Sequence, residues 1–298
     1  MNFIYLYTNA TRSDSINNFE SMSNGLSIMG HTVIGIKLNT IIDYDYITKK
    51  MNSISNYDCV ILNGWPQVLV KYLKSHNIPR LIIYDPPIRP ISNSRKFKGY
   101  WGVCWGQPHK HYYYETTLDN ARWSRVKNAM GIKVSKWRTN NNEKILIGIR
   151  RELNFDGCNE HNMNRLITTC NDISTNVVMC SRTRASHKYD MQDWPKYKSK
   201  IVVKTIKQFK YAKCLVTTGG TMVPKSIIAG LPCYYTDHTI ADPLLMTKDL
   251  KRFISNPDTP DRSKWLNWCG YQQWTCKEIE SGAAFDYIFH VKGKVYDF

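Results

Sequence analysis

The sequence predicts an α/β protein made of two Rossmann-like domains that face each other across a cleft. Short apolar runs typical of buried strands alternate with helix-like stretches over residues 1–85, and the same alternation resumes at residue 143. The chain has 298 residues, more than the roughly 100–200 residues of a typical single domain. Strands that alternate with helices at this spacing are typical of βαβ units and a parallel sheet.

The first half contains four expected strands. They cover residues 2–8 (NFIYLYT), 31–38, 57–63 and 80–85. A helix is expected over about residues 15–29, with Gly30 as the glycine that ends it, and another over 67–77. This half is therefore expected to form one parallel sheet with helices between its strands.

After residue 85 the alternation gives way to an aromatic stretch, predicted to be rich in loops up to about residue 140. The polar segment TNNNE (139–143) is typical of a turn. Strands are then expected at 143–149, 176–180, 200–204, 212–218 and 231–236, with a helix over 161–172. We therefore predict an N-terminal acceptor domain at 1–140, a C-terminal donor domain at 141–280, and a terminal segment, 281–298, that packs back on the first domain.

Charge is the most unusual global property. Lys and Arg total 41 against 24 Asp and Glu, a formal net charge of +17. A polyanionic partner such as DNA would gain affinity and association rate from this field. A composition bias of an AT-rich genome, which raises Lys content by itself, is the alternative explanation.

No apolar run approaches the about 20 residues that a membrane-spanning helix needs, and the N-terminus does not read as a signal peptide. The nine cysteines are scattered and form no CxxC pair. They are expected to be buried free thiols, so the predicted location is the cytoplasm, that of the host cell for a phage protein.

The segment CLVTTGGTMVPKSIIAGLPCYY (214–235) is the most informative motif. A buried strand leads into Gly219-Gly220-Thr221, a short helix follows over 222–229, and Gly230 ends it. Glycines at such a turn let backbone N–H groups approach a phosphate, and Thr221 is expected to cap the helix. A tight turn with purely structural glycines is the alternative.

Residues 219–232 (GGTMVPKSIIAGLP) resemble the donor-binding segment of two-domain GT-B nucleotide-sugar glycosyltransferases. The resemblance implies that Gly219, Gly220 and Thr221 face the donor diphosphate. Lys225 stands where the family has an acidic residue that holds the ribose. Lys225 is therefore expected either to bind a phosphate or to leave the ribose to another residue. The implied donor is a nucleotide sugar, with UDP as the expected nucleotide.

Two further segments are similar to the phage DNA β-glucosyltransferases that modify hydroxymethylcytosine. They are NYDCVILN with RLIIYDPPIRPIS (56–63 and 80–92) and ILIGIRREL (145–153). The first resemblance implies that Asp85 is the general base and that Arg89 lies in the acceptor loop. The second implies that Gly148, Arg150 and Arg151 bind the donor diphosphate.

The residues also support these roles directly. Asp85 ends an apolar strand, and ligands of open α/β sheets bind outside the carboxyl ends of strands. A carboxylate can take the proton of an attacking hydroxyl, and arginine binds diphosphate oxygens bidentately. Alternatively, Asp85 caps a turn before the prolines, and each arginine is a solvated charge. Arg182, Arg184 and His187 are secondary candidates because they follow another strand.

Residues 96–115 mix basic and aromatic side chains. Cations contact phosphates and rings stack on bases, so this composition favours nucleic acid and an extruded base. The DNA-binding candidates are Tyr100, Trp101, Trp105, His109 and His111. A packed loop is the alternative.

No metal site is predicted. Asp43-Tyr44-Asp45 has the DxD spacing of metal-dependent glycosyltransferases, but its polar surroundings favour a turn. His109 and His111 lack an evident further ligand.

We therefore expect a glycosyltransferase that moves a sugar from a nucleotide donor to a hydroxymethylated base in phage DNA. Its partners are modified duplex DNA and the nucleotide sugar, with no membrane and no obligatory metal. A glycosyltransferase for glycans or small molecules, and a non-catalytic nucleic-acid-binding protein, remain alternatives.

Overall fold

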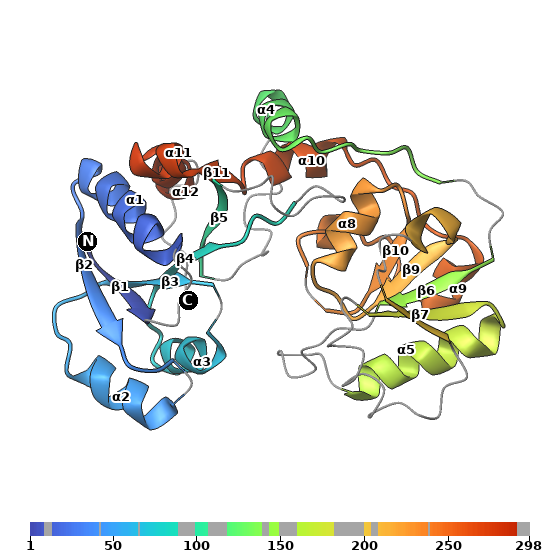
Figure 1. Ribbon diagram of the computed structural model, residues 1–298, viewed down its shortest axis with the longest axis horizontal. Helices are drawn as coiled ribbons and strands as arrows, with labels where there is room; N and C mark the ends of the chain where they lie inside the picture. Colours follow the sequence, from blue (N-terminus) through green and yellow to red (C-terminus); the bar gives the residue numbers. More distant parts are fainter. Residues whose placement is uncertain are drawn as a thin grey trace. The chain divides into compact units, whose positions relative to one another are not determined.

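The computed structural model describes residues 1–8, 14–41, 43–64, 66–88, 99–106, 118–138, 143–148, 160–181, 200–203, 208–237 and 239–290. The chain forms two compact units (Figure 1). Unit 1 comprises Met1–Pro87, Phe97–Pro108 and Tyr271–Phe298, and unit 2 comprises Ile88–Lys96 and His109–Gly270. These bounds differ from the division expected near residues 140 and 280.

Unit 1 contains a six-stranded sheet with the order β11-β5-β4-β3-β1-β2. Its strands are β1 (Asn2–Thr8), β2 (Thr32–Leu38), β3 (Cys59–Asn63), β4 (Arg80–Tyr84), β5 (Tyr100–Trp105) and β11 (Trp274–Thr275). The first four strands are parallel, as predicted from their apolar runs. Strand β5 is antiparallel to β4, and β11 is antiparallel to β5.

Helices cover both faces of the unit 1 sheet (Figure 1). They are α1 (Asp14–Ile28), α2 (Tyr44–Asn52), α3 (Gln67–Ser75), α11 (Cys276–Glu280) and α12 (Ala283–His290). Helices α2 and α3 pack their apolar sides on one face, against residues such as Ile4 and Leu62. On the other face, Tyr5 contacts Phe19 of α1, and Phe3 contacts Phe289 of α12.

The C-terminal helices are bound tightly into unit 1. Gly25 of α1 lies so close to α11 that a Cβ atom there would stand 1.9 Å from the Ile279 carbonyl oxygen. The ring of Phe289 meets the ring of Trp105 edge-on, with centroids 5.4 Å apart. Because backbone cannot yield as a flexible side chain does, a larger residue at position 25 would separate α1 from α11.

Unit 2 contains a five-stranded parallel sheet with the order β10-β9-β6-β7-β8. Its strands are β6 (Ile145–Gly148), β7 (Val177–Ser181), β8 (Lys200–Val203), β9 (Cys214–Thr217) and β10 (Cys233–Tyr235). Its helices are α4 (Ala121–Met130), α5 (Glu160–Ile173), η1 (Phe209–Tyr211), α8 (Met222–Ile228), η2 (Asp242–Leu244), α9 (Leu250–Ser255) and α10 (Ser263–Gly270).

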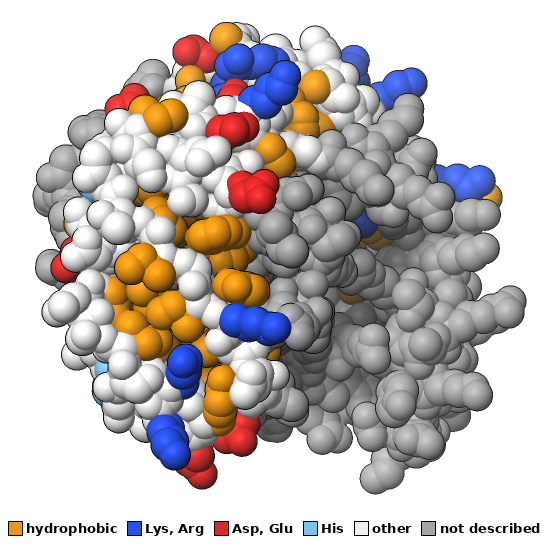
Figure 2. All heavy atoms as spheres, turned by 60° about the vertical axis from the view of Figure 1, so that its left-hand side comes forward, with side chains coloured by type: hydrophobic (Ala, Val, Ile, Leu, Met, Phe, Trp, Pro, Cys, Tyr) orange, Lys and Arg blue, Asp and Glu red, His pale blue; other side chains and the backbone are white. Residues whose placement is uncertain are grey.

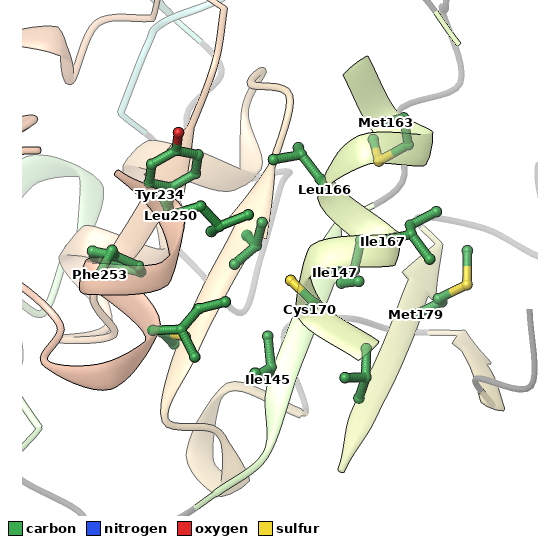
Figure 3. Close-up of a cluster of buried hydrophobic side chains, with 14 residues drawn as sticks. Ile145, Ile147, Met163, Leu166, Ile167, Cys170, Met179, Tyr234, Leu250 and Phe253 are labelled. Atoms are coloured by element: carbon green, nitrogen blue, oxygen red, sulfur yellow. The ribbon is translucent and has the colours of Figure 1, made fainter. Parts of the chain in front are cut away.

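The unit 2 sheet is also buried on both faces. Helices α5 and α9 cover one face, where side chains such as Leu166 and Phe253 pack against Ile147 and Tyr234 (Figure 3). The other face contacts Phe209 of η1 and the end of α8. Burial on both faces explains why these strands are continuous apolar runs without alternation.

The extended segment that follows α4 is fixed to unit 2. Its Ser135 and Arg138 N–H groups donate to the carbonyls of Ile228 and Gly230 at 2.9 and 2.8 Å. Arg262 donates to the carbonyls of Ile227 and Ser135, and its guanidinium carbon lies 4.1 Å from the Trp137 ring centroid. Burial lowers the pKa of Arg262, which is consistent with a structural role for its charge.

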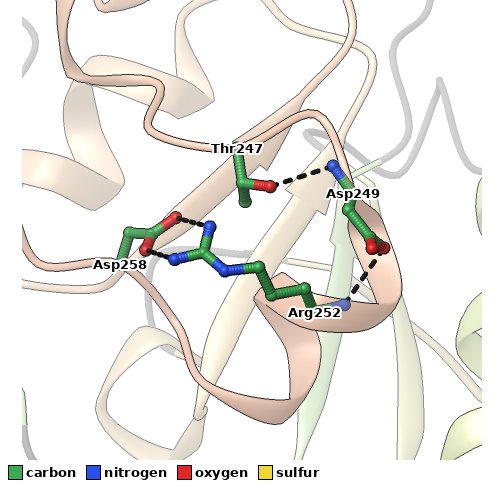
Figure 4. Close-up of polar contacts among 4 residues, drawn as sticks. All are labelled: Thr247, Asp249, Arg252 and Asp258. Carbon is green, nitrogen blue, oxygen red and sulfur yellow. Dashed lines mark hydrogen bonds and ion pairs between the residues drawn. The ribbon is translucent and has the colours of Figure 1, made fainter.

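A second arginine of unit 2, Arg252, forms an ion pair with Asp258 at the surface. Arg252 of α9 binds Asp258 through two N–H groups, at 3.0 and 3.4 Å, and Asp249 caps the same helix by accepting from the Lys251 and Arg252 N–H groups (Figure 4). The Arg252 side chain is 52% exposed. An ion pair this open to water is expected to contribute little to stability.

Two expectations from the sequence were wrong. The stretch after residue 85 is not only loop, because it contains β5 and α4. The segment that starts at Asp43 is not a turn: Asp43 is the N-cap of α2, and its carboxylate accepts from the Tyr46 N–H at 3.0 Å. Composition alone was misleading in both cases. Pairing with strands distant in the sequence determines β5, and a helix cap determines the structure at Asp43.

The thiols are mostly buried. Within the described residues, six free cysteines are buried, and Cys233 and Cys276 are partly exposed. Burial raises the pKa of Cys170 and of Cys214 to about 12.

In the described part of the chain, no helix is long and apolar enough to cross a membrane.

Candidate functional site

The carboxyl ends of β6 and β9 mark the point in unit 2 where the strand order reverses. The chain runs from β6 to its neighbour β7 on one side, and from β9 to β10 on the other. Open α/β sheets bind ligands at such a switch point, because connections that diverge leave a crevice there. The predicted residues Gly148, Gly219 and Gly220 all lie at this edge.

The turn after β9 has a backbone that suits only glycine. Gly219 has φ of 148° and Gly220 has φ of 82°. Both values lie in the region that L-residues rarely adopt. A turn of two glycines carries no side chains of its own, so a ligand such as a phosphate can approach its backbone closely.

Thr217 joins the two strands at the switch point. Its hydroxyl donates to the Gly148 carbonyl at 2.8 Å, and the Gly219 N–H donates to the same hydroxyl at 3.3 Å. Thr217 is fully buried. The hydroxyl therefore fixes the Gly-Gly turn relative to β6, a role that the sequence did not reveal because Thr217 lies inside an apolar strand run.

Gly148 is enclosed by its neighbours. A Cβ atom at this position would lie 2.6 Å from Cε of Met222 and 3.2 Å from Oγ1 of Thr217. Close packing with the start of α8 thus accounts for glycine here, and the role in donor binding remains a proposal.

The remaining donor candidates lie on α8. Thr221 occupies the N-cap position but makes no capping hydrogen bond through its side chain, so the expected cap is wrong. Its backbone is helical at this residue, with φ of −68°, whereas a capping side chain usually extends from a β-region residue. Lys225 is partly exposed on α8, and Pro224 lies in the first turn of this helix.

The chain that leaves β10 carries two carboxylates, and the first of them lies beside the Gly-Gly turn. The Asp237 N–H donates to the Thr218 carbonyl at 2.7 Å, next to Gly219. Asp242 accepts from the N–H and hydroxyl of Thr239, at 2.7 and 3.3 Å. The sequence reading missed both residues, although their position directly after a strand is a usable signal.

Unit 1 has its own switch point, between β1 and β3. Asn63 ends β3 there, and Gly64 follows with φ of 79° and donates to the Ile83 carbonyl at 2.7 Å. Burial raises the pKa of Tyr5 to about 12, while a hydrogen bond with the Asn63 side chain acts in the opposite direction. Asn63 was not among the predicted site residues.

Asp85 directly follows β4, one strand beyond this switch point. It is partly exposed, whereas Tyr84 before it and Pro86 and Pro87 after it are buried. A carboxylate held by buried neighbours on both sides can have a fixed position and still meet a ligand. The structure therefore places Asp85 at the carboxyl edge of the unit 1 sheet.

The aromatic candidates lie on β5. Trp105 is buried and contacts Phe289, so its ring packs in the core of unit 1. Tyr100 and Trp101 are partly exposed and pair with Thr275 and Trp274 of β11. Of these three residues of β5, Tyr100 and Trp101 are therefore the ones that can reach a ligand.

Several predicted residues lie outside the described part of the chain. These are Arg89, His109, His111, Arg150 and Arg151, together with the secondary candidates Arg182, Arg184 and His187. Their proposed roles rest on the sequence.

The basic excess is uneven along the sequence. Residues outside the described ranges include 17 of the 41 Lys and Arg but only 6 of the 24 Asp and Glu. On the face of unit 1 in Figure 2, Lys and Arg are interspersed with Asp and Glu and with apolar side chains. Most of the net positive charge therefore belongs to the segments outside the described ranges, several of which directly follow strands.

Within the described ranges, no three His, Cys, Asp or Glu residues are grouped as a metal site would require.

The sequence matches no known family model and no curated protein. The fold, however, is similar to two structures of KpsC from Thermosulfurimonas dismutans. Its beta Kdo 2,7 transferase has a TM-score of 0.50 at 11% identity, covering 96% of this chain and 99% of that one. Its beta Kdo 2,4 transferase has a TM-score of 0.53 at 9% identity, covering 91% of each chain. The predicted fold class, α/β with two Rossmann-like domains of the GT-B kind, is confirmed.

Proposed function

We propose that this protein is a glycosyltransferase in which unit 2 binds a nucleotide-sugar donor and unit 1 activates the acceptor. The observation that carries the proposal is the unit 2 switch point, where the Gly219-Gly220 turn is fixed to the end of β6 through Thr217. Such a turn suits the diphosphate of a donor. The fold shared with KpsC supports a sugar-transferring enzyme.

The donor is proposed to be a UDP-sugar whose diphosphate binds the turn at Gly219, Gly220 and Thr221. Arg150, Arg151 and Lys225 supply positive charge, so that the charge developing on the leaving diphosphate is neutralised without an obligatory metal. Gly148 allows the close packing that keeps β6 and the turn together.

Asp85 is the proposed general base. An acceptor hydroxyl attacks the anomeric carbon of the sugar, its proton passes to the Asp85 carboxylate, and the bond from the sugar to the diphosphate breaks. The nucleoside diphosphate leaves with the bonding electrons. The half-buried position of Asp85 at the end of β4 supports this role, because a base needs both access and a fixed geometry.

The proposed acceptor is a hydroxymethylated base in phage DNA. The net charge of +17 supports a polyanionic partner. Arg89 and the basic segments outside the described ranges would contact phosphates, and Tyr100 and Trp101 offer partly exposed rings for an extruded base. His109 and His111 remain candidates for the same surface.

A glycan acceptor is the second candidate. Both KpsC structures are named as transferases of Kdo, a sugar, and neither name mentions nucleic acid. In that case the basic residues would reflect the composition of the genome.

Mass spectrometry of nucleosides separates these proposals. The protein is incubated with hydroxymethylated DNA and a panel of nucleotide sugars, and the DNA is then digested. A mass gain of one sugar on the modified base supports the DNA acceptor. Donor hydrolysis without transfer to DNA supports a glycan acceptor. DNA binding without any donor binding or hydrolysis would leave a non-catalytic nucleic-acid-binding protein and overturn the glycosyltransferase proposal.

A further inference from the structure

We propose that β2, the open edge of the unit 1 sheet, pairs antiparallel with β2 of a second copy of this chain. Strand β2 is the last of the six strands in this sheet, and among the described residues it pairs with β1 alone. Its other edge is open to a further strand. The inference concerns the assembly of the protein and does not depend on the proposed function.

The backbone groups of β2 alternate between β1 and the open edge. The Thr32 N–H donates to the Met1 carbonyl at 3.2 Å. The next carbonyl of β1, that of Asn2, accepts from the β3 side instead, through the Asp58 N–H at 2.8 Å. Because the backbone groups of successive residues in a strand point to opposite sides, the even-numbered residues of β2 bond to β1.

The odd-numbered residues Val33, Gly35 and Lys37 therefore direct their N–H and carbonyl groups to the open edge. Sheets usually protect such an edge with a proline, a bulge or a very short strand. Strand β2 contains no proline, and it pairs with β1 in continuous register over its seven residues. Lys37, near one end, is its single charged residue. An edge this long and regular favours pairing with another strand.

Large apolar side chains are exposed along this edge. Ile34, in the middle of β2, is 57% exposed, and Ile28, at the end of α1, is 69% exposed. Met1, whose carbonyl accepts from Thr32, is 45% exposed. Figure 2, in which the β2 side of Figure 1 is turned forward, shows apolar side chains gathered on this side of unit 1. Such a group of side chains indicates a surface that another protein chain covers.

The pattern of β2 is complementary to itself. Residues directly opposite in an antiparallel pair have their side chains on the same face, so a two-fold axis perpendicular to the sheet passes beside one residue and its copy. With the axis at Gly35, Val33 lies opposite Lys37 of the second copy, and the outward residues form about six hydrogen bonds. Ile34 then lies opposite Ile36 of the second copy in a non-hydrogen-bonded pair, in which side chains are closest.

The charge of unit 1 allows two copies to approach each other. Its described residues contain 7 Lys and Arg and 9 Asp and Glu, although the whole chain has a net charge of +17. A nearly neutral surface attracts a polyanion poorly, so nucleic acid is not the partner that this edge favours. The pairing at Gly35 also separates Lys37 from Lys37 of the second copy. Charge and register therefore both favour a second copy as the occupant.

Sedimentation velocity of the full chain, after nuclease treatment, measures the association. A dimer is expected within a protein concentration range of about 1–100 μM. Its Kd should change little between about 0.1 and about 0.5 M NaCl, because salt screens exposed charges and does not weaken strand pairing.

Two substitutions in β2 test the interface. Ile34→Lys places a charge beside the same charge of the second copy and is expected to raise the dimer Kd by about 10-fold or more. Val33→Pro removes an outward N–H without taking a donor from the bonds to β1, and a similar rise is expected. Met246→Lys is the matched control: Met246 is an apolar residue of unit 2 that is 64% exposed, and its substitution should leave the Kd unchanged. Circular dichroism checks that each variant is folded.

Each result has one meaning. Loss of the dimer in both β2 variants, with Met246→Lys still dimeric, supports the inference. A natural chain that stays monomeric over the whole range overturns it and leaves the edge to an extended segment of another protein. A dimer that survives both Ile34→Lys and Val33→Pro forms through another surface and overturns it as well. Donor binding by unit 2 is measured separately, so none of these results decides the proposed function.

Discussion

The two units contain related sheets whose carboxyl edges are built from different chemistry. In unit 2, the edge at the switch point is made of backbone: glycines with positive φ and the buried hydroxyl of Thr217. In unit 1, the corresponding edge presents side chains, namely Asn63 at the end of β3 and Asp85 after β4. A backbone edge suits an anion such as a diphosphate, whereas a carboxylate edge suits removal of a proton.

The difference teaches that one architecture can supply either binding or acid–base chemistry, according to which residues follow its strands. Strand β4 also differs from its counterparts in unit 2 because it pairs with an antiparallel strand, β5. Strand β5 brings the partly exposed Tyr100 and Trp101 to the end of the unit 1 sheet, where they pair with β11. If the two edges have separate roles, substitutions at each edge should change different quantities.

The largest effect is expected at Asp85. Asp85→Asn removes the proposed base and keeps the size of the side chain, so kcat is expected to fall by about 10²–10⁴-fold. The Kd for the donor should stay unchanged, because the donor is assigned to unit 2. Asp45→Asn, at an exposed position of α2 in the same unit, is the control and should leave both quantities as they are. Loss of donor affinity in Asp85→Asn would contradict the separation of roles.

Gly220→Ala is expected to weaken donor binding, the quantity that Asp85→Asn should leave unchanged. Alanine is strained at φ of 82°, by about 1 kcal/mol, and the turn must move its N–H groups to relieve that strain. The donor Kd should rise by about 10-fold, as measured by calorimetry. Gly131→Ala is the control, since Gly131 has φ of 65° and open space around its Cβ position. An equal loss of affinity in both variants would mean that strain in unit 2, and not the turn, affects binding.

Gly148→Ala tests whether Thr217 fixes the turn. The new methyl group would press on Met222 and Thr217, which is expected to cost about 1–3 kcal/mol in the free energy of unfolding and to weaken donor binding. Adding Met222→Ala removes one of the two clashes and should recover part of the stability, measured by urea denaturation. Full stability of the single variant would show that the packing is looser than the structure indicates.

Arg262 and Arg252 of unit 2 are expected to affect stability by different amounts. Arg262→Ala leaves the Ile227 and Ser135 carbonyls without this donor and uncovers Trp137, so a loss of about 2–3 kcal/mol is expected. Arg252→Ala breaks the exposed pair with Asp258 and should cost less than about 1 kcal/mol. Thermal denaturation of both variants checks the order, and a larger effect of Arg252 would refute the assignment.

Much of the fold was predictable because its strands are buried on both faces. The runs 2–8, 59–63 and 80–84 are apolar enough to be read directly, and they are strands β1, β3 and β4. Strand β5 was missed because YWGVCW combines glycine with large aromatic residues, and pairing with β4 and β11 decides its structure. Strand order, and therefore the two switch points, depends on pairing between distant segments that a local pattern does not contain.

The candidate site was predictable where composition signals it. Gly219 and Gly220 stand out as adjacent glycines, and Asp85 stands out at the end of an apolar run. Thr217, Asn63 and Asp237 did not, because their significance comes from hydrogen bonds and strand neighbours. A polar residue inside or just after a strand acquires its meaning only once the neighbouring strand is known.

The most direct test of the central claim is hydrogen–deuterium exchange with and without the nucleoside diphosphate that binds. We expect slower exchange on binding in peptides that contain residues 217–221, at the Gly-Gly turn of unit 2, and no change in peptides that contain Asn63 or Asp85. Protection at the ends of β3 and β4, with the Gly-Gly turn unaffected, would place the nucleotide site in unit 1 and refute its assignment to unit 2.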